Sequence, residues 1–226
     1  QIMVDVKGRL DREAVRQALE RVFGRHGVLR TSFVWKDVEK PYQVVHRSVE
    51  PPIECVDFEA VPEPDRAARI GAWLDADRLA GFDLGEAPLL RLAMISLGPD
   101  EKRLVWTFHH IILEGLSFTI VLGEFWRNLA GIPLGKLPDL PAPTPYSSYI
   151  GWLRTRDRWK AEQYWRKSLH GIRAATNPPL DHRPGGEGAS GLGIRSTTRE
   201  IPQPCVAGLR ELARSHRLTL NTLIQG

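Results

Sequence analysis

A pair of adjacent histidines is the feature of this sequence with the clearest capacity for chemistry. His109 and His110 follow the alternating apolar residues Leu104, Trp106 and Phe108, and a helical spacing of apolar residues comes after them. Alternation predicts a strand and the later spacing predicts a helix, so the pair lies where a strand passes into a helix. A free imidazole has a pKa of about 6.5 and takes up a proton near neutral pH. The residue type and its position therefore predict a site of proton transfer.

Other interpretations of the pair stay open from the residues alone. Histidines are often structural, and a short motif by itself is only a hypothesis. His110 and Glu114 are four residues apart, as two metal ligands on a helix would be, but no third candidate ligand stands at a useful spacing. The sequence contains no Gly-x-Ser-x-Gly motif, so a covalent acyl-enzyme on serine is not indicated.

The elements that must position the histidines can be predicted from periodicity and turn residues. Asp11 is expected to cap a first helix, with Leu10 and Val15 in contact across the cap and Gly24 at the helix end. A turn at residues 98–100 predicts a hairpin of two strands. The expected strands are residues 2–6, 28–35, 42–46, 53–58, 89–97, 102–108 and 193–201, and the expected helices are 11–23, 64–79, 146–153, 158–169, 204–214 and the segment after the histidines.

Five runs of residues together resemble a known family. Residues 25–33 (RHGVLRTSF), 81–91 (GFDLGEAPLLR), 109–115 (HHIILEG), 145–152 (PYSSYIGW) and 218–223 (LTLNTL) occur in this order. They resemble the RHExLRTxF, PFDLxxGPLLR, HHxxxDG, YxDYAxW and TLNTLL motifs of the condensation domains of nonribosomal peptide synthetases. Because the order is the family's own across nearly the whole chain, the sequence is identified as a member of that family.

The resemblance implies an α+β fold of the chloramphenicol acetyltransferase-like superfamily, with a mixed β-sheet flanked by helices. Residues 1–178 are expected to form the N-terminal lobe without its first segment, and residues 179–226 a linker and the start of a truncated C-terminal lobe. Residues 181–191 are glycine-rich and poor in apolar side chains, so a loop is expected there. The chain lacks an initiating Met and its last apolar pattern stops at Gly226, so both ends are expected to be cut. The family's substrate channel lies between two lobes, so this fragment alone is expected to be inactive.

The resemblance also assigns roles to the residues around the pair. His110 matches the family's second histidine and is the candidate general base or positioning group. The period of two along a strand places His109 and His110 on opposite sheet faces, so only one of them can point at a shared substrate channel, which favours a structural role for His109. Gly115 is expected to let the backbone approach the substrate closely.

Glu114 is the main departure from the family pattern, which has Asp at this position. The family's acid is mainly structural and pairs with an arginine, so an ion pair between Glu114 and Arg30 is expected. Ser117 has a hydroxyl that could line the substrate channel, although a hydrogen bond at the start of the helix is the favoured interpretation.

The activity implied by the family is formation of an amide, or peptide, bond. A carrier-bound acyl or peptidyl thioester is the expected donor and a carrier-bound aminoacyl group the acceptor, with both substrates held on phosphopantetheine. No cofactor is expected on the domain itself, and the expected partners are peptidyl or acyl carrier domains and an adenylation domain in the same or a partner chain. A related CoA-dependent acyltransferase and a non-catalytic carrier-docking module, with Glu114 marking lost activity, are the alternatives.

Composition excludes several other classes of protein. The chain of 226 residues is 42% hydrophobic and 26% charged, as expected for a soluble globular protein. No apolar run approaches the roughly 20 residues that span a bilayer, and no signal peptide is recognisable at residues 1–6. Cys55 and Cys205 stand far apart, which indicates neither a disulfide scaffold nor a zinc site. A cytoplasmic protein without a membrane partner is therefore expected.

The net charge of +4 is concentrated in residues 152–173, where basic side chains alternate with tryptophans. Trp152, Trp159 and Trp165 fall at near-helical spacings, so they are predicted to form a buried stripe beneath a solvated basic face. This interpretation is favoured over nucleic-acid binding, since no nucleic-acid motif accompanies the charge. An acidic carrier protein is the alternative partner for the basic face.

Overall fold

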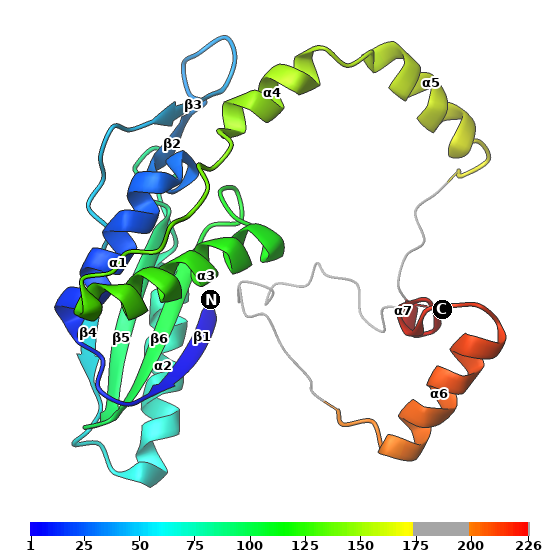
Figure 1. The fold of residues 1–226 in the computed structure, drawn as a ribbon. Helices are drawn as coiled ribbons and strands as arrows, with labels where there is room; N and C mark the ends of the chain where they lie inside the picture. Colours follow the sequence, from blue (N-terminus) through cyan, green and yellow to red (C-terminus); the bar gives the residue numbers. More distant parts are fainter. Residues whose placement is uncertain (174–198, 226) are drawn as a thin grey trace, which may run out of the picture. The chain divides into compact units, whose positions relative to one another are not determined.

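A four-stranded mixed β-sheet carries the first part of the chain. The computed structural model describes residues 1–173 and 199–225. Across the sheet the strands lie in the order β1 (Ile2–Lys7), β6 (Glu101–Phe108), β5 (Leu90–Gly98) and β4 (Ile53–Asp57). β6 pairs antiparallel with β1 and β5, whereas β4 pairs parallel with β5. The predicted mixed sheet and its β5–β6 hairpin are confirmed (Figure 1).

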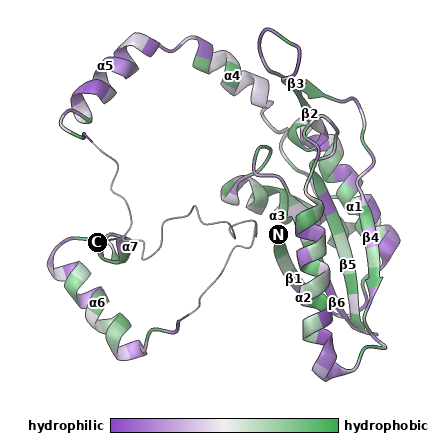
Figure 2. Ribbon diagram, turned by 180° about the vertical axis from the view of Figure 1, so that it is seen from behind, coloured by the Kyte–Doolittle hydropathy of each residue, from purple (hydrophilic) through white to green (hydrophobic). Residues whose placement is uncertain are grey.

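Helices cover both faces of this sheet. α1 (Arg12–Arg25) and α3 (Gly115–Gly131) contribute to one buried cluster, and α2 (Glu63–Ala80) contributes to the other (Figure 1). The view from behind in Figure 2 shows α2 in front of the strands. A separate antiparallel pair, β2 (Thr31–Val34) and β3 (Tyr42–Val45), follows α1.

The pleat of β5 divides the core between the two faces. Leu92 belongs to the cluster with α1 and α3, whereas Ala93 and Ile95 belong to the cluster with α2, as expected for alternating residues of a strand. Trp106 on β6 has no exposed surface, and its ring meets the ring of Phe125 edge-on with centroids 4.9 Å apart. Burying a large apolar side chain stabilises the fold by roughly 1.5–3 kcal/mol. The α3 helix that follows the histidines is therefore held firmly on the sheet.

The first helix begins as the sequence predicts and ends slightly later. The Asp11 carboxylate accepts a hydrogen bond from the Ala14 amide at 2.8 Å, which satisfies a first-turn donor. Gly24 stays inside the helix, and the chain leaves it at His26, whose backbone is extended. The predicted end at Gly24 is wrong because this glycine does not take the left-handed conformation of a C-cap.

The strand predicted at residues 28–35 is shorter than expected. Its first half is the 3-10 helix η1 (Gly27–Arg30), and only Thr31–Val34 form β2. The Thr31 hydroxyl donates to the Gly27 carbonyl at 2.9 Å, and the Leu29 amide donates to the His26 carbonyl. These local hydrogen bonds hold the backbone in a turn that the apolar pattern does not reveal.

The described residues form two compact units, Gln1–Ala161 and Glu162–Gly226. In the second unit, α6 (Gln203–Ser215) confirms the helix predicted at residues 204–214, and the shorter helix α7 (Leu220–Gln225) follows it. The predicted lobe boundary at residue 178, the loop at 181–191 and most of the strand at 193–201 lie outside the described residues. The boundary between the lobes therefore stays a prediction.

The tryptophan stripe predicted in the basic segment is not buried in the described structure. Trp152, Trp159 and Trp165 are 50%, 67% and 57% exposed. Neither α4 (Tyr146–Arg154) nor α5 (Arg158–Ser168) has a buried residue. The prediction failed because helical spacing identifies a common face without showing that another element covers it. Within the described ranges, no helix combines the length and the apolar character needed to cross a bilayer.

A partly buried ion cluster joins the end of α1 to the middle of α3. Arg25 Nε donates to Glu124 Oε2 at 2.9 Å, and His26 Nε2 lies 2.8 Å from the same oxygen. Arg25 also donates to the Pro141 carbonyl at 2.8 Å. Burial raises the pKa of Glu124, but the hydrogen bonds from Arg25 and His26 outweigh burial and hold the pKa below its usual range. The cluster thus fixes α3, which follows the histidines, to the first helix.

Replacing Glu124 by Gln is expected to lower the stability of the fold at neutral pH and to weaken the dependence of that stability on pH. A carboxyl whose pKa is depressed by folding stabilises the protein above the unfolded-state pKa, about 4.3, and this contribution is lost as the pH falls through the folded-state value. We expect Glu124→Gln to lower the free energy of unfolding at neutral pH by about 1–3 kcal/mol, because Arg25 loses its partner. Urea unfolding between about pH 3 and 7 measures both effects.

Glu20→Gln is the matched control, since Glu20 pairs with Arg16 on the surface of α1 with 39% of its side chain exposed. An exposed pair of this kind contributes little to stability. Identical pH dependence of stability for Glu124→Gln and the unchanged protein would contradict a role for the cluster.

Candidate active site

The two histidines lie in the turn directly after β6 rather than within the strand. β6 ends at Phe108, and the His109 amide makes the last bond across the hairpin, donating to the Leu89 carbonyl at 3.0 Å. The Ile112 amide then donates to the His109 carbonyl at 3.1 Å and closes the turn. The predicted placement of His109 and His110 on opposite sheet faces is therefore wrong, because the alternation of a strand stops before them.

The His109 ring stabilises this turn. Its Nδ1 accepts a hydrogen bond from the Ile111 amide at 3.0 Å. An acceptor nitrogen carries no proton, so the neutral ring of His109 holds its proton on Nε2. His109 is partly buried, and the geometry supports the structural role that the sequence favoured for it.

The His110 ring carries its proton on Nδ1, the nitrogen that is unprotonated in His109. His110 Nδ1 lies 3.0 Å from the Leu113 carbonyl, which can only accept a hydrogen bond. The proton is therefore on Nδ1, and Nε2 of the neutral ring has a free lone pair. His110 is exposed, and its Nε2 has no protein partner among the described residues. The ring is thus oriented by the backbone and has one basic nitrogen available to a substrate.

Aromatic packing holds the same ring from the strand side. The Phe108 ring meets the His110 ring edge-on, with centroids 5.7 Å apart and planes at 80°. Phe108 in turn stacks on Phe118 of α3 at 5.0 Å. Contacts of this kind favour one orientation of a side chain. The position of His110 therefore depends on both the strand before it and the helix after it.

Glu114 forms the N-cap of α3. Its carboxylate accepts hydrogen bonds from the Leu116 and Ser117 amides, each at 3.0 Å. The Ser117 hydroxyl accepts from the Glu114 amide at 2.8 Å, which completes a reciprocal capping box. The helix-start hydrogen bond favoured for Ser117 is present. Glu114 is therefore a structural acid, although with a different partner from the one expected.

The predicted ion pair between Glu114 and Arg30 is not formed. Arg30 instead donates to the backbone carbonyls of Phe23, at 2.8 Å, Arg47, also at 2.8 Å, and His46. It ties the end of α1 to the segment after β3. The predicted pair is absent because each side chain hydrogen-bonds to backbone groups instead. Opposite charge alone does not show that a side chain has such backbone partners.

Gly115 is the first residue of α3. A Cβ built at this position meets no atom within 4 Å in the described structure. Packing therefore does not require glycine here, and the space beside the backbone is open to a ligand.

Asp77 is a supporting residue that the sequence analysis missed. Arg91 Nε donates to Asp77 Oδ1 at 2.5 Å, and the Thr107 hydroxyl and the Gln1 side-chain amide both donate to Oδ2 at 2.6 Å. Burial raises the pKa of Asp77, but the hydrogen bonds from Arg91, Thr107 and Gln1 hold the pKa below its usual range. The network fastens α2 to β5 and β6, and so steadies the strand that leads to the histidines.

A signal for Asp77 was present in the sequence. Ile70, Trp73 and Leu74 form the apolar face of α2 that packs on the sheet, and Asp77 continues their helical spacing. An acid on a buried stripe requires a partner, because an unpaired buried charge is costly. The partner, Arg91, closes the run at residues 81–91 that the family resemblance had singled out.

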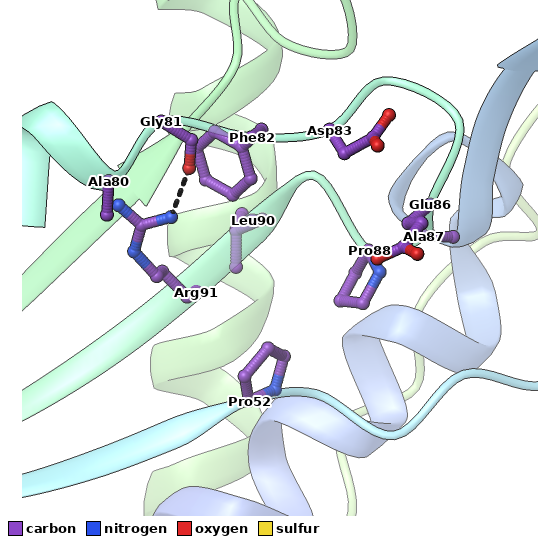
Figure 3. A pocket seen from close by; sticks show the side chains of 10 residues that line it. All are labelled: Pro52, Ala80, Gly81, Phe82, Asp83, Glu86, Ala87, Pro88, Leu90 and Arg91. Carbon is purple, nitrogen blue, oxygen red and sulfur yellow. Dashed lines mark hydrogen bonds between the residues drawn. The ribbon is translucent and has the colours of Figure 1, made fainter.

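A cavity of about 290 Å³ adjoins this network (Figure 3). Arg91 lies on its wall, donates to the Gly81 carbonyl at 2.7 Å and places its guanidinium 4.4 Å from the centre of the Phe82 ring. Pro52 and Pro88 form other parts of the lining. The Arg91 guanidinium is hydrogen-bonded to Asp77 and Gly81 of the protein. We therefore give Arg91 a structural role and place no catalytic residue in this cavity.

The fold and the histidine turn together define the class of protein. The family model of the condensation domain matches residues 1–226, so the chain belongs to the condensation domain family. One of the subunits of linear gramicidin synthase from Brevibacillus parabrevis is 36% identical over 222 residues, which cover 97% of this chain and 3% of that protein. One of the subunits of plipastatin synthase from Bacillus subtilis (strain 168) is 34% identical over 97% of this chain and 8% of that protein. The chain thus spans a small part of the length of these relatives.

Solved structures agree with this membership. The X-domain from teicoplanin biosynthesis is 27% identical with a TM-score of 0.64, over 80% of this chain and 40% of that one. The starter condensation domain of rhizomide synthetase RzmA is 20% identical with a TM-score of 0.65, over 75% of this chain and 41% of that one, and this likeness bears on the fold alone. The predicted α+β, chloramphenicol acetyltransferase-like fold is confirmed.

Removing the α3 cap is expected to lower stability independently of Arg30. Glu114→Ala should reduce the free energy of unfolding by about 1 kcal/mol, within the usual range of roughly 0.5–2 kcal/mol for loss of an N-cap. Glu114→Asp should retain stability, because Asp is a preferred N-cap residue and is the acid usual in the family. Urea unfolding measures each change.

A double mutant of Glu114→Ala and Arg30→Ala distinguishes the separate roles of these residues from an ion pair. Residues that share no partner have additive effects, within about 0.3–0.5 kcal/mol. A summed loss clearly larger than that of the double mutant would restore the ion pair and contradict the separate roles seen in the structure.

Proposed function

We propose that this chain is part of a condensation domain that forms an amide bond between a thioester donor and an amine acceptor, with His110 at the reacting atoms. The observation that carries the proposal is the hydrogen bond from His110 Nδ1 to the Leu113 carbonyl, 3.0 Å long. It fixes the tautomer in which exposed Nε2 has a lone pair. That is the arrangement a group needs to accept a proton, or a hydrogen bond, from an attacking amine.

The bonds that change set the task of this imidazole. The amine nitrogen forms a bond to the thioester carbonyl carbon, the C–S bond breaks, and a proton passes from nitrogen to the departing sulfur. His110 Nε2 either takes that proton and returns it to sulfur or orients the amine by accepting its hydrogen bond. The imidazolium form would keep its Nδ1–H bond to Leu113, so the ring need not turn during the transfer.

The neighbouring residues have supporting roles in this proposal. His109 stabilises the turn through its bond from the Ile111 amide, and Glu114 with Ser117 fixes the start of α3. The Leu116 and Ser117 amides donate to the Glu114 carboxylate. We therefore do not propose that they stabilise the negative charge that develops on the carbonyl oxygen of the thioester. The Ser117 hydroxyl is engaged in the capping box, so its role as a channel residue has less support than its role in the cap. Arg30 acts at a distance by joining α1 to the segment after β3.

Family membership supports a proposal for the substrates and partners. The relatives are synthase subunits, and we propose that donor and acceptor arrive as phosphopantetheine thioesters on carrier-protein domains, with an adenylation domain in the same or a partner chain. The domain itself is proposed to hold no cofactor. Both cysteines of the chain, Cys55 and Cys205, are exposed free thiols, which suits a reducing, cytoplasmic setting.

A docking module without catalysis is the second candidate. The X-domain from teicoplanin biosynthesis, 26% identical to this chain in that structure, was solved as a complex with OxyB, so a domain of this fold binds another protein. The replacement of the family's Asp by Glu114 is the feature that raises this candidate here. Retention of the capping box by Glu114 favours the catalytic proposal, because the local geometry of the turn survives the change.

His110→Ala in the full-length protein is expected to reduce the rate of condensation by about 10²–10⁴-fold with the fold intact. The reason is loss of the basic nitrogen that the described turn leaves available to a substrate. Single-turnover transfer between loaded carrier proteins, followed by mass spectrometry of the amide product, measures the rate.

His109→Ala is the matched control for this experiment. It removes the ring that accepts the Ile111 amide, so a lower melting temperature is expected with a smaller effect on the chemical step. A rate for His110→Ala close to that of the unchanged protein would reject the role of His110, and would favour the docking module if carriers still bind.

Gly115→Ala tests whether the substrate uses the space beside Gly115, because the substitution is not expected to destabilise the fold. Since a Cβ at this position meets no neighbouring atom within 4 Å in the part of the chain that the structure describes, the melting temperature is expected to stay the same or rise slightly. Turnover is expected to fall at least about tenfold if the substrate occupies that space, since misplacement by about 1 Å can cost roughly 10²-fold in rate. Unchanged turnover would remove Gly115 from the site.

A further inference from the structure

A row of aromatic rings connects the buried core to the imidazole of His110. The Trp106 ring, which has no exposed surface, meets the Phe118 ring edge-on with centroids 5.7 Å apart. Phe118 stacks on Phe108 at 5.0 Å with planes at 16°, and Phe108 meets His110 at 5.7 Å. Among the described residues, the Phe118 ring contacts Trp106 and Phe108 but not the ring of His110. The ring of Phe118 therefore reaches that of His110 through Phe108.

The hydrogen bond to the Leu113 carbonyl leaves the His110 ring some freedom. Rotation of a histidine ring about χ2 has broad minima, and a hydrogen bond weakens steeply only when its angle falls below about 120°. Nε2 is separated from the bonded Nδ1 by a carbon atom of the ring, so a tilt that the hydrogen bond tolerates still moves Nε2. A second contact is needed to hold this nitrogen in one place, and the Phe108 ring provides it.

The Phe108 ring depends in turn on the ring behind it. Phe108 is only partly buried, whereas Phe118 is 3% exposed and stacks face to face on it. Phe118 is the fourth residue of α3, and its amide donates to the Glu114 carbonyl at 2.8 Å. The capped start of the helix thus places a flat ring against Phe108, and an aliphatic side chain at residue 118 would not offer the same stacking face.

We propose that Phe118 is a positioning residue for the condensation reaction, which acts through Phe108 to keep His110 Nε2 at the place where it meets the amine. The inference rests on the proposed function, because it assigns an effect on the rate to the orientation of that nitrogen. Phe118 itself contacts no reacting group. Misplacement of a catalytic group by about 1 Å can cost roughly 10²-fold in rate, and a partial loss of order costs less.

Phe118→Leu tests this role, because it keeps an apolar side chain in the core and removes the flat face on which Phe108 stacks. In the full-length protein we expect the single-turnover rate at saturating loaded carriers to fall about tenfold. The carrier concentration that gives half the maximal rate should not change, since the loss then belongs to the chemical step. Phe118→Met is a second variant with the same expected result, for use if Phe118→Leu does not fold.

Phe125→Leu is the matched control, since it makes the same change on the same helix. Phe125 is fully buried, and its ring contacts Trp106 and Trp126 in the described structure. Both variants should lower the melting temperature by similar amounts. At a temperature well below the onset of unfolding, Phe125→Leu should retain the rate of the unchanged protein, so a general loss of packing is distinguished from a loss of positioning.

A double mutant tests whether Phe118 acts through Phe108. Phe108→Leu removes the ring that contacts His110, so this change alone should slow the chemical step. Adding Phe118→Leu to Phe108→Leu should cause no further loss of rate, because residues in contact that serve one effect are coupled. Losses of rate that multiply independently would overturn the proposed route.

NMR of the His110 ring gives a readout that does not depend on turnover. In full-length protein labelled with ¹⁵N-histidine, Phe118→Leu should produce a mixture of the two neutral tautomers of His110. Phe125→Leu should keep the form protonated on Nδ1. Unchanged His110 signals in Phe118→Leu would overturn the proposal.

The rates of three variants separate failure of this inference from failure of the proposed function. A normal rate for His110→Ala would reject the proposed function and this inference with it. A slow His110→Ala with a normal Phe118→Leu would reject this inference alone, as would an equal loss of rate for Phe118→Leu and Phe125→Leu.

Discussion

The hydrogen bond between His110 Nδ1 and the Leu113 carbonyl is the interaction on which the candidate site depends. A histidine in a turn has two nitrogens and several rotamers, and only a fixed partner decides which nitrogen meets the substrate. Leu113 is buried, and the residue after it caps α3, so the accepting carbonyl is held by the helix that follows. The chemistry of one side chain thus rests on the junction between a strand and a helix.

Contacts far apart in the sequence keep that junction in place. Glu124 fixes α3 to the end of α1 through Arg25 and His26, and Asp77 fixes α2 to the strands through Arg91 and Thr107. Both carboxylates are largely buried and satisfied by more than one donor, which is what makes a buried charge compatible with stability. The helices on the two sides of the sheet are therefore each anchored by one ionic cluster, and the strand that leads to the histidine turn runs between them.

Much of this arrangement could be predicted from the sequence, because the relevant signals are local. The alternation before His109 predicted β6, the apolar spacing after Gly115 predicted α3, and Asp11 predicted the first cap. What could not be predicted were choices among partners. Glu114 and Arg30 were matched by opposite charge, yet each hydrogen-bonds to backbone groups instead. The end of the strand at residue 108 was predicted, but periodicity could not show how the turn after it orients the two histidine rings.

The tryptophans show a second limit of prediction from sequence, which concerns burial. Their spacing indicated one helical face, but burial depends on whether another element covers that face, which no local pattern encodes. Asp77 shows the reverse case, since an acid on an apolar stripe was visible and would have predicted a buried partner. An acid that continues an apolar stripe thus indicates a buried ion pair, which in this fold is Asp77 with Arg91.

The tautomer of His110 decides whether its Nε2 can accept a proton or a hydrogen bond from a substrate. Long-range proton–nitrogen NMR spectra of the ¹⁵N-labelled chain, recorded where the imidazole is neutral, distinguish a protonated nitrogen from a bare one. We predict a protonated Nδ1 and a bare Nε2 for His110, with the reverse assignment for His109. A His110 ring protonated on Nε2 would contradict this mechanism, because the nitrogen assigned to the substrate would then have no lone pair to offer.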